Sequence, residues 1–279
     1  MPQPLRNLAL VVNPTKTRAP QVAEALQRRA GELGAQAHLI ADYPLNAEAL
    51  KGMDGCCVIG GDGTLMGAVE AAVANDVPVF GVNRGKLGFL VTLSEAQALQ
   101  QLPKIIKGDY QIALRHVLQA TAADGKQALA LNDVVLKNTD TFRIISLKVK
   151  ANGELVSVYA GDGLIFSSAT GSTAYNLSAG GPIMHPDMRA IAMTPICPHT
   201  LSNRSVIFPK DSVFEVLAED TQPQVALDGY LKFGGKEPCP LTIRHHERPL
   251  KLIQPDGYSY FDILRKKLRW NTEPDYNPS

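Results

Sequence analysis

The pattern of apolar residues changes near Tyr110, and this change constrains the fold more than any other feature of the sequence. Before it, apolar runs typical of buried strands alternate with segments of helical periodicity, such as a strand at 8–12 followed by a helix at about 21–33. After it, short alternating runs follow one another, and Asn152-Gly153 is a strong signal for a two-residue hairpin turn. We therefore expect an α/β unit followed by an antiparallel β unit.

The length of 279 residues supports the same division, because a single core usually holds ~100–200 residues. We expect a Rossmann-like α/β nucleotide-binding domain over residues 1–108 and an antiparallel β-sandwich domain over residues 109–254, with the run PLKLIQP at 249–255 as its last strand. Helical spacing returns in the segment 258–270, and we expect a C-terminal helix there, with residues 255–279 packing back on the first domain.

Other elements of the first domain follow the same rhythm of strand and helix. Helix-forming residues at 64–74 predict one helix, and Ser94 is well suited to cap the start of another that runs to about residue 107. Strands are expected at 37–40, 56–59 and 77–82.

Charge and composition exclude several classes of function. The formal net charge is +1, so the chain has no general attraction for nucleic acid or for anionic membranes. The apolar stretch before Pro14 is too short for a signal or membrane segment, and the four cysteines lack the C-x-x-C spacing of zinc and redox motifs. We expect a cytoplasmic protein with reduced, structural cysteines that binds a charged small molecule at a local site.

The sequence Gly60-Gly61-Asp62-Gly63-Thr64 stands where a buried strand ends and a helix begins. In an open α/β sheet, ligands bind beyond the carboxyl ends of the strands, and glycines let the backbone approach a phosphate closely. Asp62 would add a carboxylate acceptor to that crevice. The alternative is a simple Asp-Gly turn, but the position between strand and helix favours a ligand site.

Familiar phosphate-binding motifs do not fit this chain. A Walker A loop fails at Gly81–Lys86, because one residue is missing between the glycines and Leu87 follows where Ser or Thr is required. The Rossmann fingerprint fails because Met66 stands where its third glycine belongs, and the protein-kinase triplets HRD and DFG are absent.

A second dense segment covers residues 161–182, with hydroxyl side chains at 167, 168, 170, 172, 173 and 178. Buried hydroxyls need partners, so we expect this segment to line a groove for ribose, phosphate and adenine rather than to be mainly core. A flexible linker is the alternative, and the apolar residues within the segment argue against it.

Asn132-Asp133 interrupts an apolar run and either forms a bulge or binds a ligand. The basic residues at 265–269 are typical of a solvated helix end.

Five segments together resemble bacterial NAD kinases: GGDGT at 60–64, NRGKLGFL at 83–90, LND at 131–133, GDGLIFSSATGSTAYNLSAGGP at 161–182 and YFDILRKKLRW at 260–270. The resemblance implies transfer of the terminal phosphoryl group of ATP, or of polyphosphate, to the 2′-hydroxyl of the adenosine ribose of NAD, giving NADP. It also implies a divalent metal, Mg²⁺, and a homodimer or homotetramer. Because lipid kinases acting on diacylglycerol or sphingosine share GGDGT, a lipid kinase remains an alternative, as does a non-catalytic NAD(P) sensor.

The resemblance also implies roles for individual residues. Asp62 is expected to be the catalytic carboxylate, and Asp162 to reach the nicotinamide half of a dinucleotide across a subunit interface. Ala169 stands where the family commonly has Pro, which we expect to loosen the loop before binding. No metal ligand is assigned. The residues expected to bind substrate are Gly61, Gly63, Thr64, Phe89, Asn132, Asp133, Asp162, Thr173, Ala174, Tyr175 and Ser178.

Overall fold

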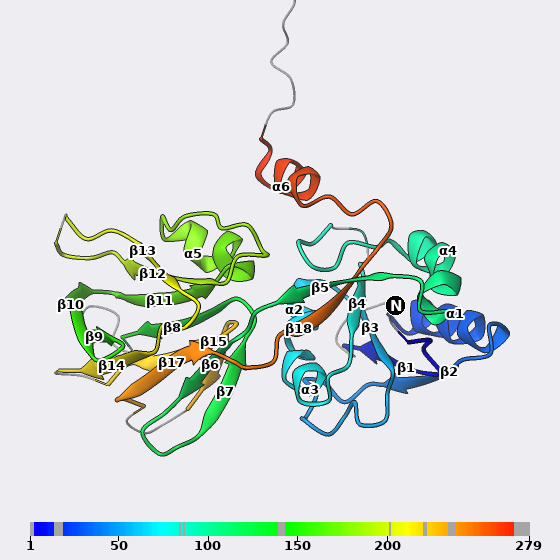
Figure 1. Ribbon diagram of the computed structural model, residues 1–279, viewed down its shortest axis with the longest axis horizontal. Helices are drawn as coiled ribbons and strands as arrows, with labels where there is room; N and C mark the ends of the chain where they lie inside the picture. The colour runs from blue at the N-terminus through cyan, green and yellow to red at the C-terminus, as the bar shows by residue number, and fades with distance from the viewer. Residues whose placement is uncertain are drawn as a thin grey trace, which may run out of the picture. The chain divides into compact units, whose positions relative to one another are not determined.

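A computed structural model divides the chain into two compact units, shown in Figure 1. Unit 1 contains the residues up to Ala113 and those from Lys251 onward, and unit 2 is the continuous segment Leu114–Leu250. The expected boundaries, at residues 108 and 254, lie a few residues from these. The structure describes residues 3–13, 19–83, 85, 87–138, 143–200, 202–219, 222–233 and 238–270.

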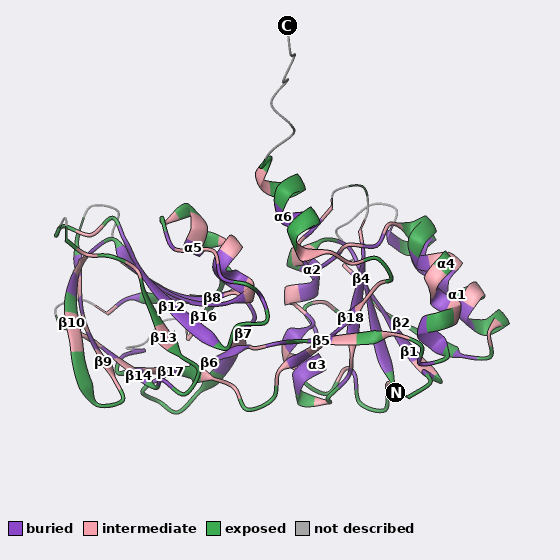
Figure 2. Cartoon of the chain, turned by 45° about the horizontal axis from the view of Figure 1, so that its top comes forward, coloured by how far each residue is buried: buried purple, intermediate pink, exposed green. Residues whose placement is uncertain are grey.

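Unit 1 is built on a six-stranded sheet with the order β2-β1-β3-β4-β18-β5. The pairs from β2 to β18 are parallel, and the strands β1, β3 and β4 are almost entirely buried, as the purple ribbons of Figure 2 show. Such strands are apolar on both faces, which agrees with the continuous apolar runs in the sequence. The elements are β1 (Asn7–Val12), α1 (Ala19–Glu32), β2 (Gln36–Ile40), β3 (Gly55–Ile59), α2 (Asp62–Met66), α3 (Val69–Ala74), β4 (Val79–Val82), α4 (Glu95–Ile106), β5 (Gln111–Arg115), β18 (Leu250–Gln254) and α6 (Tyr260–Leu268).

The single helix expected at 64–74 is wrong, because the structure has two short helices, α2 and α3, separated at Gly67 and Ala68. Tyr43 explains the break. Its hydroxyl donates a hydrogen bond to the carbonyl of Gly63 (2.7 Å), and its ring lies so close to Gly67 that an added Cβ there would sit 2.4 Å from it. Tyr43 therefore presses against the segment where a continuous helix would have to pass.

The run PLKLIQP does not belong to the antiparallel domain, as the sequence had suggested. It forms β18, which pairs in parallel with β4 through Leu252 and Val79 in the sheet of unit 1. The reason lies in its burial, because Leu250, Leu252 and Ile253 are all buried and the strand thus has apolar contacts on both faces. The chain returns to unit 1 at this strand.

Unit 2 consists of two six-stranded antiparallel sheets, with the orders β10-β9-β14-β17-β6-β7 and β13-β12-β11-β8-β15-β16. Phe214 of the first sheet lies 4.9 Å, between ring centroids, from both Phe166 and Phe208 of the second. These rings join the two sheets in one core. The strands are β6 (Leu118–Thr121), β7 (Gln127–Ala130), β8 (Asp133–Lys137), β9 (Ile145–Ala151), β10 (Glu154–Gly161), β11 (Gly163–Ser168), β12 (Ala190–Ile196), β13 (Val206–Pro209), β14 (Phe214–Ala218), β15 (Gln224–Leu227), β16 (Tyr230–Lys232) and β17 (Leu241–His245).

The predicted hairpin at Asn152-Gly153 is confirmed. Both residues have positive φ angles, 51° and 85°, and they connect β9 to β10. Two successive positive φ angles define the type I′ turn, whose twist matches that of the paired strands. Asp228 and Gly229 have the same combination, 51° and 80°, between β15 and β16.

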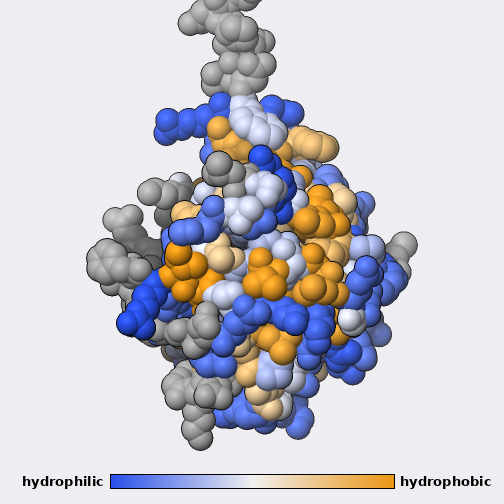
Figure 3. Space-filling model, turned by 90° about the vertical axis from the view of Figure 1, so that its left-hand side faces the viewer, coloured by the Kyte–Doolittle hydropathy of each residue, from blue (hydrophilic) through white to orange (hydrophobic). Residues whose placement is uncertain are grey.

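Edge strands of unit 2 carry exposed apolar side chains. Leu155 and Val158 lie on β10, and Val206 and Ile207 lie on β13, each the outermost strand of its sheet. Figure 3 views the molecule from the side of these strands and shows apolar groups scattered among polar ones. An exposed edge of this kind can pair with another chain.

The C-terminal helix α6 belongs to unit 1, as expected. Ser259 caps its start by accepting a hydrogen bond from the N–H of Asp262, and Ile263 and Leu264 are buried. Within the described part of the chain, no helix combines the length and apolar character that crossing a membrane requires.

The described cysteines are all free thiols. Cys56, Cys57 and Cys239 are buried, as expected of structural cysteines, but Cys197 is exposed. Burial raises the pKa of Cys56 to about 12, so its thiol stays protonated and unreactive.

Substitution of Ser94 tests the start of α4. Ser94 accepts a hydrogen bond from the N–H of Gln97, and the Gln97 side chain accepts one from the N–H of Ser94, which is a complete capping box. Ser94→Ala should lower the stability of unit 1 by about 1 kcal/mol. Urea unfolding followed by fluorescence of Trp270, the single tryptophan, measures this. Gln100→Ala, on an exposed position of the same helix, is the control, and equal unfolding midpoints for wild type and Ser94→Ala would contradict the expectation.

Candidate active site

Asp62 is the first residue of α2 and follows directly on the buried strand β3 and the turn Gly60-Gly61. The turn is tight because a Cβ added to Gly60 would lie 2.3 Å from the hydroxyl oxygen of Thr64. Thr64 itself is buried, whereas Gly61 and Gly63 are exposed. Asp62 thus stands at the carboxyl edge of the parallel sheet, where ligands bind in folds of this class.

Three backbone N–H groups hold the carboxylate of Asp62. Its Oδ2 accepts a hydrogen bond from the N–H of Phe89 (2.8 Å), and its Oδ1 accepts from the N–H groups of Leu90 (3.1 Å) and Val91 (2.9 Å). Since a carboxylate offers about four acceptor positions, about one remains, on Oδ2. The side chain is therefore fixed in orientation and still able to accept one more hydrogen bond.

Gly88 makes this arrangement possible. A Cβ added to Gly88 would lie 2.1 Å from Oδ1 of Asp62, so the loop can approach the carboxylate only with glycine at this position. Phe89 follows and is half-buried. The ammonium group of Lys267, on α6, lies 5.5 Å from the centroid of the Phe89 ring.

In unit 2, the residues after β11 form a short 3₁₀ turn, Thr170–Thr173, and the one-turn helix α5 (Tyr175–Ser178). Gly171 brings this segment against Asn132, because a Cβ there would lie 2.1 Å from the Asn132 carbonyl oxygen. The same carbonyl accepts a hydrogen bond from the N–H of Ser168 (2.8 Å). The structure thus joins two of the segments that the sequence analysis singled out.

The hydroxyl groups of this segment divide into two sets. Ser167, Ser168 and Ser172 are fully buried, so the expectation that the segment is not mainly core is wrong for them. Ser172 Oγ donates to the carbonyl of Ala169 (2.8 Å) and accepts from the N–H of Met184 (2.9 Å), which satisfies the hydroxyl inside the protein. The accessible hydroxyl groups are those of Thr173, Tyr175 and Ser178, and the partly exposed Ala174 lies among them.

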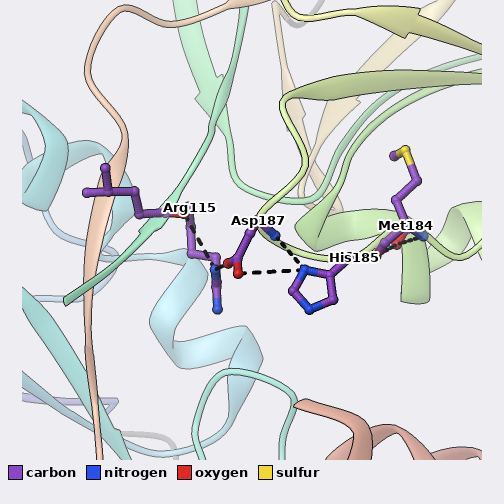
Figure 4. Close-up of polar contacts among 6 residues, drawn as sticks. Arg115, Met184, His185 and Asp187 are labelled. Carbon is purple, nitrogen blue, oxygen red and sulfur yellow. Dashed lines mark hydrogen bonds and ion pairs between the residues drawn. The ribbon is translucent and has the colours of Figure 1, made fainter. Parts of the chain in front are cut away.

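Behind this segment lies an ion pair that the sequence did not reveal, shown in Figure 4. Arg115 is 2% exposed, and its Nη1 donates to Oδ1 of Asp187 at 2.6 Å. Oδ2 of Asp187 lies 3.6 Å from Nδ1 of His185. Because Met184 of the same loop bonds Ser172, Arg115 supports the 170–178 segment through the loop 184–187.

Two carboxyl groups lie beside Asn132, that of the buried Asp133 and that of the partly buried Asp228. Asp228, in the turn after β15, accepts hydrogen bonds from the N–H groups of Leu131 (2.7 Å), Asn132 (2.7 Å) and Asp133 (3.2 Å). Burial raises the pKa of Asp228 to about 6, although these three bonds and the charge of Lys232 oppose the rise. The only signal for Asp228 in the sequence is an Asp-Gly turn.

Asp133 holds its proton more strongly than Asp228. Burial, and then the charge of Asp228, raise the pKa of Asp133 to about 7, while a hydrogen bond from the N–H of Tyr175 opposes the rise. Asp228 has three N–H donors and a nearby lysine, so it is the better place for the negative charge. When the pair holds one proton, as it does below about pH 7, the proton therefore lies on Asp133, whose carboxyl can then donate a hydrogen bond.

Asn132 and Tyr175 complete the accessible part of this site. The side chain of Asn132 is partly exposed, and among the described residues we find no hydrogen-bond partner for its amide. The ring of Tyr175 lies 5.9 Å from the ammonium group of Lys137. The sequence left open whether Asn132-Asp133 forms a bulge or binds a ligand. In the structure, Asn132 lies directly before β8, and the buried Asp133 is the first residue of that strand.

Asp162 lies apart from these residues. It is exposed and precedes Gly163 at the start of β11, whereas Ser167, near the other end of that strand, pairs with Asp133. Five residues of extended strand separate the two positions, or roughly 17 Å. Within one chain, Asp162 therefore does not join the Asn132 cluster.

The described residues form no cluster of three or more His, Cys, Asp or Glu side chains that could hold a metal ion. Asp62 is no exception, because most of its acceptor positions already receive backbone hydrogen bonds. A cage made of protein ligands is therefore absent from the described part of the chain.

Asp133→Asn tests the buried carboxyl pair. Because the pKa of Asp133 rises from 3.8 to about 7 on folding, the unfolded chain gives up this proton first, and stability falls between about pH 4 and pH 7. Asn cannot ionise, so the variant should lose less stability than wild type between pH 5 and pH 8, by about a few kcal/mol. Calorimetric unfolding at several pH values measures this. Asp162→Asn, at an exposed position, is the control, and a pH-independent difference between Asp133→Asn and wild type would contradict the assignment.

Comparison with known proteins shows which family has this architecture. The family model described as the ATP-NAD kinase N-terminal domain matches residues 40–110, and that of the ATP-NAD kinase C-terminal domain matches residues 131–254. An NAD kinase of Aromatoleum aromaticum is 35% identical over 297 aligned residues, which cover 98% of each chain. An NAD kinase of Coxiella burnetii is 39% identical, over 79% of this chain and 76% of the relative.

Solved structures show the same fold. Yeast NADH kinase, complexed with NADH, matches with a TM-score of 0.81 at 22% identity, over 98% of this chain and 90% of the yeast chain. An NAD kinase from Archaeoglobus fulgidus in complex with ATP matches with a TM-score of 0.76 at 25% identity, over 94% and 98% of the two chains. The domain matches and the full-length bacterial relative together show that this chain belongs to the NAD kinase family.

Proposed function

We propose that this chain transfers the terminal phosphoryl group of ATP to the 2′-hydroxyl of the adenosine ribose of NAD, giving NADP and ADP. The main support for this proposal is the position of the Asp62 carboxylate. Three backbone N–H groups fix it at the carboxyl edge of the parallel sheet, and one acceptor position on Oδ2 remains for a substrate hydroxyl. Membership of the NAD kinase family supplies the reaction. It also decides against the lipid-kinase alternative that the shared GGDGT sequence had left open.

In the proposed mechanism, Asp62 accepts a hydrogen bond from the 2′-hydroxyl and orients its oxygen toward the γ-phosphorus. The bond from this oxygen to phosphorus forms as the bond between the γ-phosphorus and the bridging oxygen of ADP breaks. Phosphoryl transfer has a loose transition state, so orientation contributes more than early removal of the proton. Asp62 takes the proton late. The exposed backbone at Gly61 and Gly63 leaves room for phosphate oxygens near this carboxylate.

The adenosine and ribose groups of NAD bind, in this proposal, to residues of unit 2 around Asn132 and Tyr175. Asn132 can both donate and accept hydrogen bonds, the protonated carboxyl of Asp133 can donate one, and Tyr175 offers a ring face for stacking. In unit 1, the proposed contacts with substrate are Gly61, Gly63, Thr64 and Phe89. The remaining proposed contacts are Thr173, Ala174 and Ser178.

A divalent cation, Mg²⁺ in our proposal, would enter with the phosphates of ATP rather than occupy a site made of protein ligands. Mg²⁺ commonly keeps several water ligands and binds through substrate phosphates. This mode of coordination is compatible with the lack of a ligand cluster among the described residues. No residue is assigned to the metal. A cytoplasmic location is also part of the proposal, and the free thiols of the described cysteines support it.

Self-association is the last part of the proposal. The exposed apolar residues on the edge strands β10 and β13 are suited to contact a second copy of the chain. Asp162 immediately follows β10, so such a contact would bring it close to the partner. This agrees with the role that the family resemblance implies for Asp162.

Asp62→Asn should lower turnover by about 10² or more, because the amide loses the charge and the acceptor position that orient the 2′-hydroxyl. The measurement is NADP formation from NAD, ATP and magnesium by purified protein. Asp109→Asn changes an exposed acid of the same unit and should leave turnover unchanged. Near-normal turnover of Asp62→Asn would end the proposal for this residue.

Mixing two inactive variants tests Asp162. If Asp162 acts across a subunit interface, oligomers that combine Asp62→Asn and Asp162→Asn subunits should contain some sites with both native carboxylates. Activity should then appear on mixing and reassembly, up to about a quarter of that of wild type for randomly paired dimers. Mixed oligomers with no more activity than the sum of the separate variants would contradict a role across the interface.

A further inference from the structure

Lys267 is exposed, as expected for the basic end of this helix, but it also makes contacts outside the helix. Its Nζ donates a hydrogen bond to the carbonyl of Leu87 at 2.8 Å and lies 5.5 Å from the centroid of the Phe89 ring. Its neighbour Arg265 pairs instead with Asp262 of the same helix. Lys267 therefore links α6 to the loop that contains the donors to Asp62.

This loop depends on a small number of polar contacts. The N–H of Gly88 donates to the carbonyl of Val91 (3.0 Å), and the N–H groups of Phe89, Leu90 and Val91 point to Asp62. Glycine at position 88 removes the side chain that could otherwise restrict the backbone. The contact from Lys267 fixes the carbonyl just before this glycine.

An open cavity lies between the loop and the approach to α6. Its volume is about 170 Å³, and its lining includes Leu87, Thr92 and Leu93 of the loop, the residues 255–259 and Lys266. Where side chains do not fill the space, a directional contact has more influence on the position of the backbone. Lys267 supplies such a contact beside the cavity.

We propose that Lys267 is a positioning residue for phosphoryl transfer. By holding the carbonyl of Leu87 and the ring of Phe89, it keeps the three N–H groups of residues 89–91 aimed at the carboxylate of Asp62, and so keeps Asp62 in its productive orientation. The inference rests on the function proposed above for Asp62. It assigns to the C-terminal helix a part in catalysis, which acts through the loop and not through contact with substrate.

Three substitutions test this on the full-length enzyme. Lys267→Met keeps the length of the side chain but removes its charge and donors, and should lower kcat about tenfold with a smaller change in the KM for ATP. Lys267→Arg keeps a cation and donors and should recover most of the loss. Lys266→Met, which changes the adjacent exposed lysine, is the matched control and should keep the wild-type kcat.

Hydrogen exchange supplies a readout that does not depend on activity. In Lys267→Met, the amides of residues 89–91 should exchange about tenfold faster than in wild type, because they leave Asp62 more often. The fluorescence of Trp270, three residues beyond Lys267, should stay unchanged, because Ile263 and Leu264 keep α6 in place. If that fluorescence shows that the helix has come away, Lys267→Gln replaces Lys267→Met; its amide nitrogen is uncharged and one bond closer to the backbone than Nζ of lysine, so it should also lower kcat.

The outcomes separate this inference from the proposed function. Normal exchange at residues 89–91, or a normal kcat, in Lys267→Met would overturn the role of Lys267, even where Asp62→Asn is inactive. Normal turnover of Asp62→Asn would instead overturn the proposed function of Asp62, whatever Lys267→Met does. Failure of Lys267→Arg to recover activity would also contradict the proposal, because arginine can make the same two contacts.

Discussion

The hydrogen bonds from residues 89–91 to Asp62 are the constraint on which the rest of unit 1 depends. A carboxylate at the end of a buried strand needs partners, and the chain supplies them from its own backbone. This requires a glycine at 88, a loop that returns over the end of the sheet, and a helix start at Asp62. Folding already provides the free energy that orders these elements. The carboxylate therefore needs little reorganisation when substrate binds.

In unit 2, side-chain hydrogen bonds and an ion pair hold the loops that carry the candidate binding residues. The carboxylate of Asp228 accepts hydrogen bonds from the backbone N–H groups of residues 131–133. The hydroxyl of Ser172 accepts one from the N–H of Met184 and so connects the 170–178 segment to the next loop. Arg115 supports the same loop from behind through Asp187. The accessible residues Tyr175 and Asn132 are thus held by a network of hydrogen bonds and one ion pair, an arrangement typical of sites that must keep their geometry.

Local features of the sequence predicted much of the fold. The strand expected at 56–59, the cap at Ser94 and the turn at Asn152 depend on neighbours within a few residues, and the structure has all three, the strand as Gly55–Ile59. The break between α2 and α3 could not be predicted, because its cause, Tyr43, lies some twenty residues away. The same holds for β18, whose partner strand is β4, and for Asp228, Arg115 and Lys267, whose partners are distant in the sequence. The family resemblance supplied the candidate site residues, and their roles in binding and catalysis stay predictions.

The position of β18 also has a consequence for biosynthesis. In the sheet of unit 1 this strand lies between β4 and β5, yet it is made only after the whole of unit 2. On the ribosome, the continuous segment 114–250 can complete its two sheets while the α/β sheet still lacks an inner strand, because domains tend to fold as their residues emerge. Strand β18 thus completes the sheet of the unit that was begun first, and a nascent chain stalled before β18 would carry Asp62 on an unfinished sheet.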